Sequence, residues 1–421
     1  PPRSTLFPYT TLFRSEMIDG ATASSYAPNR QGSYSVVIRD EFNCIDTSNV
    51  LQVLPVMEAK TFADITLPHQ AYLNGLHWID INNDGLPDYF NHLGEYYIAL
   101  GNGEYIKEPY GDGPPVLANE IHPADFNKDG ILDYFTNSRA ASISADRYCL
   151  IDQTGKFNCS ILEPSEFFGS SIAGAMGDYD NDGEPELYIR TVGNIDVFVN
   201  WNGETFEGET KNRLQYGNDF NEPKDPEWID IDNDLDLDLL LSNYINFNED
   251  LTFDTRSYLE LEVDDRIFAS IVVDINNDGL RDVFLSDEDQ NYMFLQNQDG
   301  TFTKNTTFGF LGTTHAGQIL VWEDYDDDGD LDLFFRGYEV TDSLERFYYE
   351  NKISAVNKGI TVGLVGTVSN KMSIGARVYV TATIFGNRVT QMGEMDNKGS
   401  LRMHFGLGDA DVIESIRVDW P

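Results

Sequence analysis

The sequence of 421 residues has no long apolar run and few basic residues. No stretch approaches the ~20 consecutive apolar residues of a transmembrane helix, so we expect no membrane span. Lysine and arginine number 28 against 71 aspartate and glutamate residues, which gives a formal net charge of −43. This charge repels nucleic acid phosphates and anionic lipid, and no basic patch offsets it. The composition therefore excludes a nucleic acid partner.

Helical periodicity is nearly absent from the sequence, and strand-forming residues are frequent. Aromatic residues make up 13% of the chain, which argues against disorder despite the high charge. Val, Ile, Tyr and Phe are the residues that favour strands. The sequence predicts a folded, acidic, all-β protein.

Cysteine is also scarce, since three in this length do not make a disulfide scaffold. Cys149 and Cys159 flank a DQTGKF turn between two predicted strands. A cross-strand disulfide and two buried free thiols both fit this spacing, because strand register decides whether the side chains share a face. Cys44 has no evident partner within the sequence.

One acidic pattern recurs six times, first as WIDINNDGLPDYF at residues 78–90. Oxygen-bearing side chains occupy positions 1, 3, 5 and 9 of each copy, and glycine occupies position 6 in all copies but the fourth. The copies, which we call loops 1 to 6, begin at residues 80, 125, 178, 230, 274 and 324. Two carboxylates about 4 Å apart repel by roughly 4 kcal/mol at a protein surface. Repetition of such crowding predicts cations in these loops, several in all and up to one per loop.

All-oxygen ligation without thiolate or imidazole favours Ca²⁺ or Mg²⁺, and a flexible set of many ligands favours Ca²⁺. Side chains at positions 1, 3, 5 and 9 and the backbone carbonyl at position 7 are the predicted donors. They are Asp80, Asn82, Asp84, Leu86 and Asp88; Asp125, Asn127, Asp129, Ile131 and Asp133; Asp178, Asp180, Asp182, Glu184 and Glu186; Asp230, Asp232, Asp234, Asp236 and Asp238; Asp274, Asn276, Asp278, Leu280 and Asp282; and Asp324, Asp326, Asp328, Asp330 and Asp332.

The loops do not match the two best-known calcium loops. An EF-hand requires a bidentate glutamate at position 12 and a helix on each side. Position 12 holds Asn91, Thr136, Ile189, Leu241, Leu285 and Phe335. The glycine-rich repeat of calcium β-rolls is absent as well. What remains is a nine-residue loop between two strands.

Short apolar runs precede and follow each loop, and a third run with an Asn-Gly or Asp-Gly hairpin signal comes next. Periods of ~40–50 residues with four strands each are typical of propeller blades. The last repeat lacks a fourth strand, and we expect residues 60–66 to supply it and close the ring. This predicts a six-bladed β-propeller over residues 58–351, or a seven-bladed one if residues 210–262 contain another blade.

Residues 5–15, TLFPYTTLFRS, resemble the translation of a sequencing adapter, so we expect residues 1–15 to be an unstructured artefact outside the fold. Strand-like runs at 33–39 and 49–54 resemble the last strands of an immunoglobulin-like module, and residues 16–57 are the expected partial domain. The true N-terminus and its signal peptide are expected to be missing from this fragment, and the C-terminus to be truncated.

The loops and the strands after them resemble FG-GAP/VCBS repeats, the blades of integrin-α-like propellers. Residues 352–421 resemble the ASPIC/UnbV domain, on the segments NKGITVGLVGTVSNKMSIGARVYVT and LRMHFGLGDADVIESIRVDWP. Loop 4 departs from the pattern with Leu235 in place of glycine, and loop 3 has Glu186 in place of aspartate. The resemblance implies a secreted or cell-surface protein of bacterial type, with a role in adhesion or binding.

No catalytic motif stands out in the sequence. His77 and His122 precede loops 1 and 2 by three residues and are interpreted as packing or channel-lining residues. Trp78, Trp228 and Trp322 precede loops 1, 4 and 6 by two residues and are interpreted as packing between blades. We expect a non-enzymatic, calcium-rigidified module for a protein or glycan partner. The alternative is a propeller-type polysaccharide lyase or hydrolase with its site on one face.

Overall fold

The computed structural model describes most of the chain from residue 77 onward and short segments before it. The described residues are 9–14, 16–17, 32–39, 45–47, 51–53, 58–60, 77–90, 96–101, 104–107, 120–137, 146–162, 171–191, 196–210, 214, 226–242, 244–249, 251–257, 267–287, 291–305, 317–324, 327–338, 344–352, 356–396 and 401–421. Their regular structure is entirely β-strand, as the sequence predicts. No helix in these ranges is long and apolar enough to span a bilayer.

Six four-stranded antiparallel sheets form the main body of the described chain. Five of them use four consecutive strands each, in the order of the sequence. These strands are β7 (His77–Ile79), β8 (Asp88–Phe90), β9 (Tyr96–Ala99) and β10 (Tyr105–Lys107); β11 (Glu120–Ala124), β12 (Asp133–Asn137), β13 (Arg147–Ile151) and β14 (Phe157–Ile161); β15 (Ser171–Gly177), β16 (Glu186–Thr191), β17 (Asp196–Trp201) and β18 (Phe206–Thr210); β19 (Glu227–Ile229), β20 (Asp238–Leu241), β21 (Tyr244–Glu249) and β22 (Thr252–Ser257); and β23 (Ile267–Val273), β24 (Asp282–Asp287), β25 (Asn291–Gln296) and β26 (Phe302–Asn305).

The sixth sheet combines strands from distant parts of the chain. It contains β27 (Gly317–Glu323), β28 (Asp332–Tyr338), β29 (Leu344–Glu350) and, at its edge, β6 (Glu58–Lys60). Tyr349 pairs with Ala59 across this edge. A segment before the first loop therefore supplies the fourth strand, as expected, although it lies just upstream of the predicted range 60–66. Residues 61–66 lie outside the described residues.

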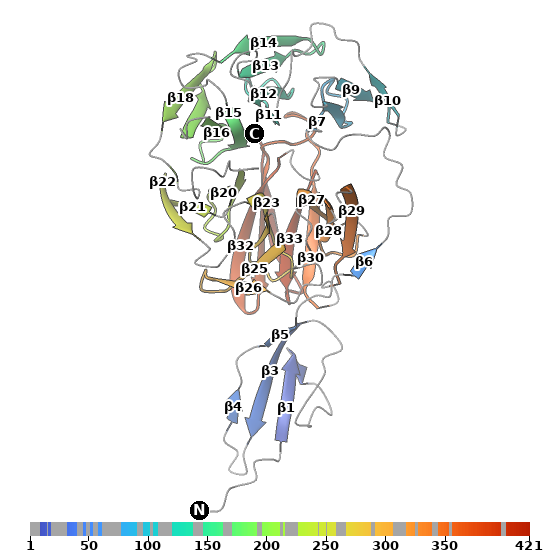
Figure 1. Cartoon of the computed structure of the whole chain (residues 1–421), viewed down its shortest axis with the longest axis vertical. Coiled ribbons are helices and arrows are strands. Elements are labelled where there is room, and N and C mark those ends of the chain that lie inside the picture. The colour runs from blue at the N-terminus through green and yellow to red at the C-terminus, as the bar shows by residue number, and fades with distance from the viewer. Residues whose placement is uncertain are drawn as a thin grey trace, which may run out of the picture.

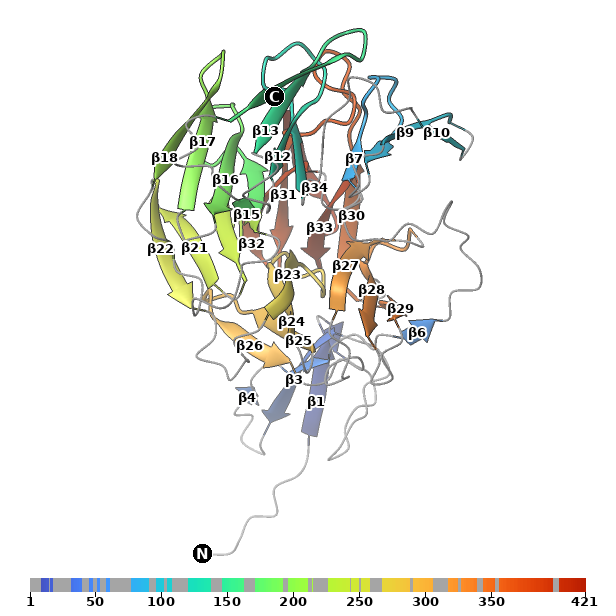
Figure 2. The ribbon, with the colours of Figure 1, turned by 45° about the horizontal axis from the view of Figure 1, so that its top comes forward.

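Figures 1 and 2 show the six sheets following one another in chain order around a common centre. The first strands lie innermost: β11 contacts both β7 and β15, β15 contacts β19, and β23 contacts β27. Each acidic loop joins the first strand of its sheet to the second. Because the first strands are equivalent, all six loops lie at the same end of the body.

Aromatic packing between neighbouring sheets agrees with the interpretation of the tryptophans. The Trp228 ring stacks on Tyr179 of loop 3, with 5.5 Å between centroids, and Trp322 is buried against Phe284. The side chains of Trp78 and His77 lie outside the described part. His122 is buried beside Phe135, which agrees with a packing role.

Cys149 and Cys159 face each other directly in the β13–β14 pair and form a disulfide. Of the two alternatives that the sequence left open, the structure has the cross-strand bridge. Cys44 lies outside the described residues.

A separate small sheet lies near the N-terminus (Figure 1). Its strands are β1 (Tyr9–Arg14), β2 (Glu16–Met17), β3 (Gly32–Arg39), β4 (Ile45–Thr47) and β5 (Leu51–Val53). The prediction that residues 1–15 are unstructured is wrong for residues 9–14, which pair with β3. The reason is local: Tyr9, Thr10 and Thr11 begin a run of β-branched and aromatic residues that readily extends a sheet edge.

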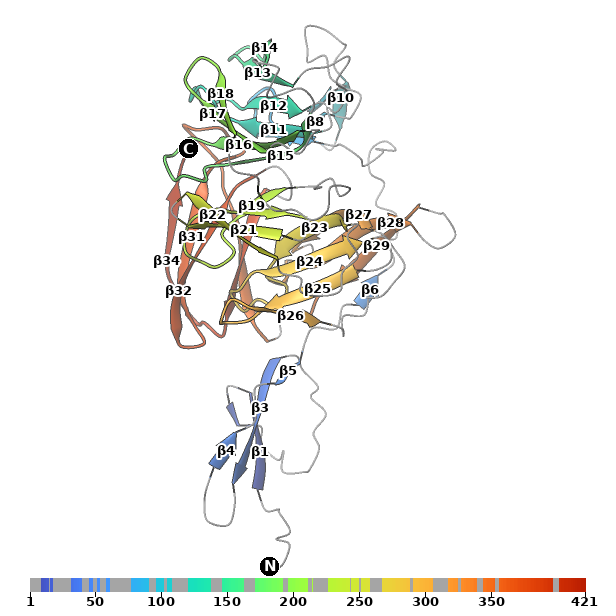
Figure 3. The same cartoon turned by 60° about the vertical axis from the view of Figure 1, so that its left-hand side comes forward.

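The last part of the chain forms two further antiparallel sheets. One pairs β30 (Lys358–Gly363) with β33 (Arg402–Gly408), and the other has the order β32 (Asn387–Glu394), β31 (Arg377–Ile384), β34 (Ile413–Asp419). We call residues 356–421 the C-terminal domain. Figure 3 shows β31, β32 and β34 running along one face of the main body. Met372, Ile374 and Val378 share a buried cluster with Ile79 and Ile121, so the two parts have a common core.

Candidate metal centre

The backbone of every loop has the same shape. Position 4 is left-handed in all six loops, at Asn83, Lys128, Asn181, Asn233, Asn277 and Asp327, with φ between 53° and 62°. Position 6 is left-handed as well, with φ from 85° to 90° at the five glycines and 79° at Leu235. The glycines predict the conformation at position 6, whereas position 4 was not predicted. Its signal was the asparagine at that position in four of the six loops, since asparagine tolerates this conformation.

Carboxylates hold this shape by accepting hydrogen bonds from loop amides. In loop 1, Asp80 accepts bonds from the amides of Asp84 at 2.9 Å and Gly85 at 2.7 Å. The side chain at position 5, Asp84, accepts a bond from the amide of Leu86 at 2.8 Å. The same position-1 and position-5 bonds recur in loops 2, 3, 5 and 6. The side chains at positions 1 and 5 therefore point toward the inside of a shared turn.

Position 9 anchors the loop to its sheet. Asp88 is fully buried and accepts bonds from the amide of Ile81 at 2.9 Å and from Ala99, at the end of the third strand, at 2.7 Å. Asp238 and Asp282 make equivalent pairs of bonds in loops 4 and 5. A buried carboxylate thus lies beneath each of these loops.

Two loops bring three carboxylates close together. Oxygens of Asp178, Asp180 and Glu186 in loop 3 lie within 4.8 Å of one another, and so do those of Asp230, Asp232 and Asp234 in loop 4. Glu184, at position 7 of loop 3, turns away and pairs with Lys128 of loop 2 at 2.9 Å, so only its backbone carbonyl is available to that loop. Asp326 lies outside the described residues.

The electrostatics show how unfavourable this crowding is for carboxylates alone. Burial raises the pKa of Asp88 to about 6, of Asp133 to about 7 and of Asp238 to about 9. Burial, together with the charges of Asp180, Asp178 and Asp182, raises the pKa of Glu186 to about 9. A divalent cation coordinated by these oxygens would offset both the cost of burying the carboxylates and the repulsion between them.

The donors also fit such a cation individually. Asp133 Oδ2, Asp230 Oδ2 and Asp236 Oδ1 are buried and accept no hydrogen bond from the described residues. A buried carboxylate oxygen without a partner is costly, and a hard cation satisfies it. The donor set contains oxygen only, which agrees with the predicted type of ion.

Loop 4 differs from the other five in the hydrogen bonds that its position-1 aspartate accepts. In those loops the glycine amide at position 6 donates to the second oxygen of the position-1 aspartate. In loop 4 the residue is Leu235, and Asp230 Oδ2 accepts no hydrogen bond from the part of the chain that the structure describes. Leu235 keeps the left-handed backbone, so the loop bears the strain instead of opening into a wider turn.

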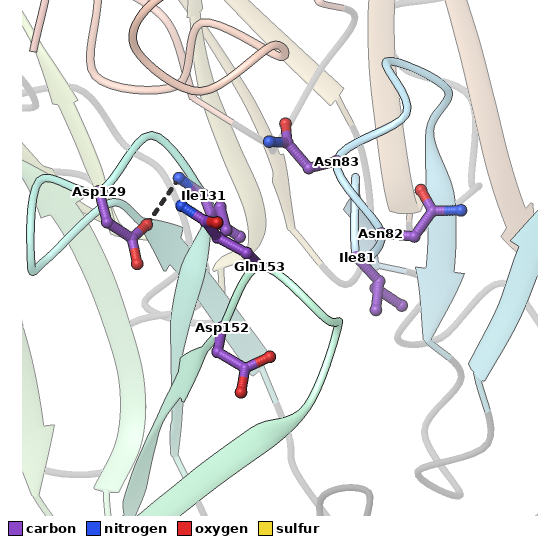
Figure 4. Close-up of a pocket in the computed structure, with 7 residues that line it drawn as sticks. All are labelled: Ile81, Asn82, Asn83, Asp129, Ile131, Asp152 and Gln153. Atoms are coloured by element: carbon purple, nitrogen blue, oxygen red, sulfur yellow. Dashed lines mark hydrogen bonds between the residues drawn. The ribbon is translucent and has the colours of Figure 1, made fainter.

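A polar pocket of about 280 Å³ lies between loops 1 and 2 (Figure 4). Ile81 and Ile131 provide its apolar part. Its polar lining comes from Asn82, Asn83, Asp129, Asp152 and Gln153. The pocket therefore combines carboxylate and amide groups from two neighbouring sheets.

Two family models match the chain. The FG-GAP-like repeat matches residues 145–241 and 274–335, and the ASPIC and UnbV domain matches residues 366–421. The chain thus contains the two kinds of module that the sequence resembled. No curated protein matches the sequence.

Several solved structures align with large parts of the chain at low sequence identity. A lectin from Agrocybe aegerita that recognises non-reducing terminal N-acetylglucosamine is 13% identical, with 80% of this chain and 89% of that chain covered and a TM-score of 0.45. The biofilm matrix protein Bap1 of V. cholerae is 12% identical over 71% of this chain and 60% of that chain, with a TM-score of 0.34. A protein from Lactobacillus plantarum is 9% identical, with 81% of this chain and 99% of that chain covered and a TM-score of 0.38.

Proposed function

We propose that this chain, which carries FG-GAP-like repeats and an ASPIC and UnbV domain, is a six-bladed β-propeller that binds Ca²⁺ in its blade loops and acts as an extracellular binding module. The observation that carries the proposal is the repeated loop geometry. Five loops have the same amide-to-carboxylate bonds, which orient two aspartates toward one turn above a buried carboxylate. Calcium in these turns would make the loop face rigid.

The six sheets support six blades. Strands β19 to β22 fill the interval 210–262, in which the sequence left room for a seventh blade, with one sheet among its described residues. The pairing of β6 with β29 would close the ring, because the strand that precedes the first blade completes the last.

A chemical argument supports an extracellular place for the protein. A disulfide such as Cys149–Cys159 persists in oxidising compartments. The proposed role is non-enzymatic, with a protein or glycan partner.

Calcium binding is tested by isothermal titration of the chelator-treated protein with Ca²⁺ and, separately, with Mg²⁺. We expect several Ca²⁺ ions per chain and weaker binding of Mg²⁺, because Mg²⁺ demands near-octahedral geometry and keeps its waters. An absence of heat and of bound calcium in equilibrium dialysis would refute the proposal. The partner class is tested by protein and glycan arrays with and without Ca²⁺, and turnover of an arrayed polysaccharide would contradict the non-enzymatic role.

A further inference from the structure

The C-terminal domain lies directly on the acidic loops, and it covers them unequally. Lys371 Nζ donates to the carbonyl of Asn83 in loop 1, and Arg402 pairs with Asp327 in loop 6 at 3.1 Å. Arg377 donates to the carbonyl of Asp178 and to the Asn181 side chain in loop 3. At loop 1 the domain reaches a position-4 carbonyl. At loops 3 and 6 it also approaches the position-1 carboxylate, where Arg377 lies 3.5 Å from Asp178 Oδ2 and Thr361 Oγ1 lies 3.4 Å from Asp324 Oδ2.

Loop 5 is the one that the domain covers most completely among the described loop residues. Gly408 donates its amide to the carbonyl of Asn277 at 2.7 Å, and Asn357 Nδ2 donates to the carbonyl of Asn276 at 2.7 Å. His404 Nε2 lies 2.7 Å from Asn277 Oδ1. The backbone of Gly406 is so close that a Cβ atom there would lie 1.9 Å from Asp274 Oδ2.

The loops differ in how far the position-3 side chain is exposed to solvent. Asn276 of loop 5 is only 4% exposed. Its counterparts in loops 1, 2 and 4, Asn82, Asn127 and Asp232, are exposed, and Asp180 in loop 3 is half-buried. A cation in loop 5 would therefore lie beneath the C-terminal domain, whereas a cation in loop 1 would face solvent.

The carboxylates of loop 5 favour a cation after the domain has docked. In the ionised form that binds a cation, Asp274, Asp278 and Asp282 carry three negative charges, and the buried Arg281 carries one positive charge. Burial, and then Arg281, lowers the pKa of His404 to about 3, so this histidine is neutral and adds no charge to the interface. Two negative charges thus remain, which one divalent ion neutralises.

We propose that the C-terminal domain encloses the loop 5 site, so that Ca²⁺ held there exchanges with solvent only when the domain lifts from the loops. The proposal rests on calcium binding by the loops. Docking and ion binding then stabilise each other, because the domain contacts the folded shape of loop 5 that the ion also requires.

The test is the rate of calcium release from the full chain. Calcium-loaded protein is mixed with an excess of a fluorescent calcium chelator in a stopped-flow instrument. We expect a fast phase from the exposed loops and a slow phase of one ion per chain. The slow phase should be slower by about tenfold or more, within the usual range of coupling between two sites.

Two variants at the same loop position assign the phases. Asp278→Ala removes a loop 5 donor and should abolish the slow phase with the loss of one ion. Asp84→Ala removes the equivalent loop 1 donor and should reduce only the fast phase. The reverse pattern would overturn the proposal.

A second pair of variants tests the role of the domain. A Cβ at position 359 would lie 2.5 Å from the carbonyl oxygen of Gly329 in loop 6, so Gly359→Ala should lift the domain and convert the slow phase into a fast one. Gly363→Ala, on the same strand, places its Cβ 4.0 Å from the nearest atom and should leave the slow phase unchanged. A slow phase that survives Gly359→Ala overturns the enclosure.

The two proposals fail in different ways. If no calcium is bound at all, calcium binding and enclosure are both wrong. If several ions are bound and all leave in one fast phase, the loops bind calcium but the C-terminal domain does not enclose loop 5.

Discussion

Arg377 and Glu394 face each other across the β31–β32 pair, with 2.7 Å between Nε and Oε2, directly above loop 3. Both side chains are nearly buried, at 7% and 10% exposure. Arg377 also lies 3.5 Å from Asp178 Oδ2, so one guanidinium connects a strand pair of the C-terminal domain to the first aspartate of a loop. The pair is the main charged link between the domain and the loop face.

Replacing Arg377 should therefore be costly. Arg377→Gln leaves Glu394 buried without its partner, and loss of one member of a buried pair costs about 3–5 kcal/mol. Chemical denaturation should show this as a lower free energy of unfolding. Arg388→Gln is the matched control, because Arg388 pairs with Glu414 on the same domain but is exposed. An exposed ion pair contributes about 0–1 kcal/mol to stability. If both variants lower the free energy of unfolding equally, the Arg377–Glu394 pair contributes no more than an exposed pair.

Calcium should remove a pH dependence that the ion-free protein has. In the folded state the pKa values of Asp88, Asp133 and Asp238 lie at about 6, 7 and 9, above the ordinary 3.8. The folded state then binds protons that the unfolded state releases, so the free energy of unfolding falls as pH rises from about 4 through these pKa values.

Thermal melts between pH 5 and pH 8 in chelator should show this fall, whereas melts in excess Ca²⁺ should show a smaller one. Calcium at about 100 times its dissociation constant adds about 2.7 kcal/mol per site. Equal midpoints with calcium and with chelator at pH 8 would contradict the assignment of the loops as metal sites.

Deleting β6 should open the last sheet. A chain that starts at residue 58 keeps the strand that pairs with β29, and a chain that starts at residue 68 loses it. The longer chain should unfold cooperatively, and the shorter one should aggregate because the edge of β29 is exposed. Light scattering and thermal melts compare the two, and identical behaviour would mean that β6 does not complete the structure.

The fold and the acidic loops were largely predictable from the sequence because both depend on local patterns. The recurrence of Asp80, Asp84 and Asp88 with a glycine between them specifies a turn through short-range hydrogen bonds, and short-range bonds follow from spacing. The described closing strand, Glu58–Lys60, begins two residues before the predicted range 60–66, since only its long-range pairing with β29 defines it.

Docking of the C-terminal domain was not predictable for the same reason. Asn181 meets Arg377 across 196 residues of sequence, and Asn277 meets His404 across 127. Loops 1 and 5 differ only at position 8, which is Pro87 in one and Arg281 in the other, and the burial of Asn276 appears only in three dimensions. The disulfide likewise required the register of β13 and β14.

Loop 4 should gain affinity for calcium when its leucine is replaced by glycine. Leu235 has a φ of 79° where the other loops have glycine, and a left-handed non-glycine residue costs on the order of 1 kcal/mol. The loop retains its three clustered carboxylates, so the donors are present and the backbone is what differs. Since about 1.4 kcal/mol is a factor of ten in binding, Leu235→Gly should tighten calcium binding at this site several-fold, as measured by calorimetry.

The converse variant is Gly183→Leu in loop 3. There φ is 85° and no atom lies within 4 Å of an added Cβ, so the substitution introduces backbone strain without a steric clash. Gly183→Leu should weaken calcium binding at loop 3 by a similar factor. Unchanged affinities in both variants would show that the residue at position 6 does not control how tightly the loops bind calcium.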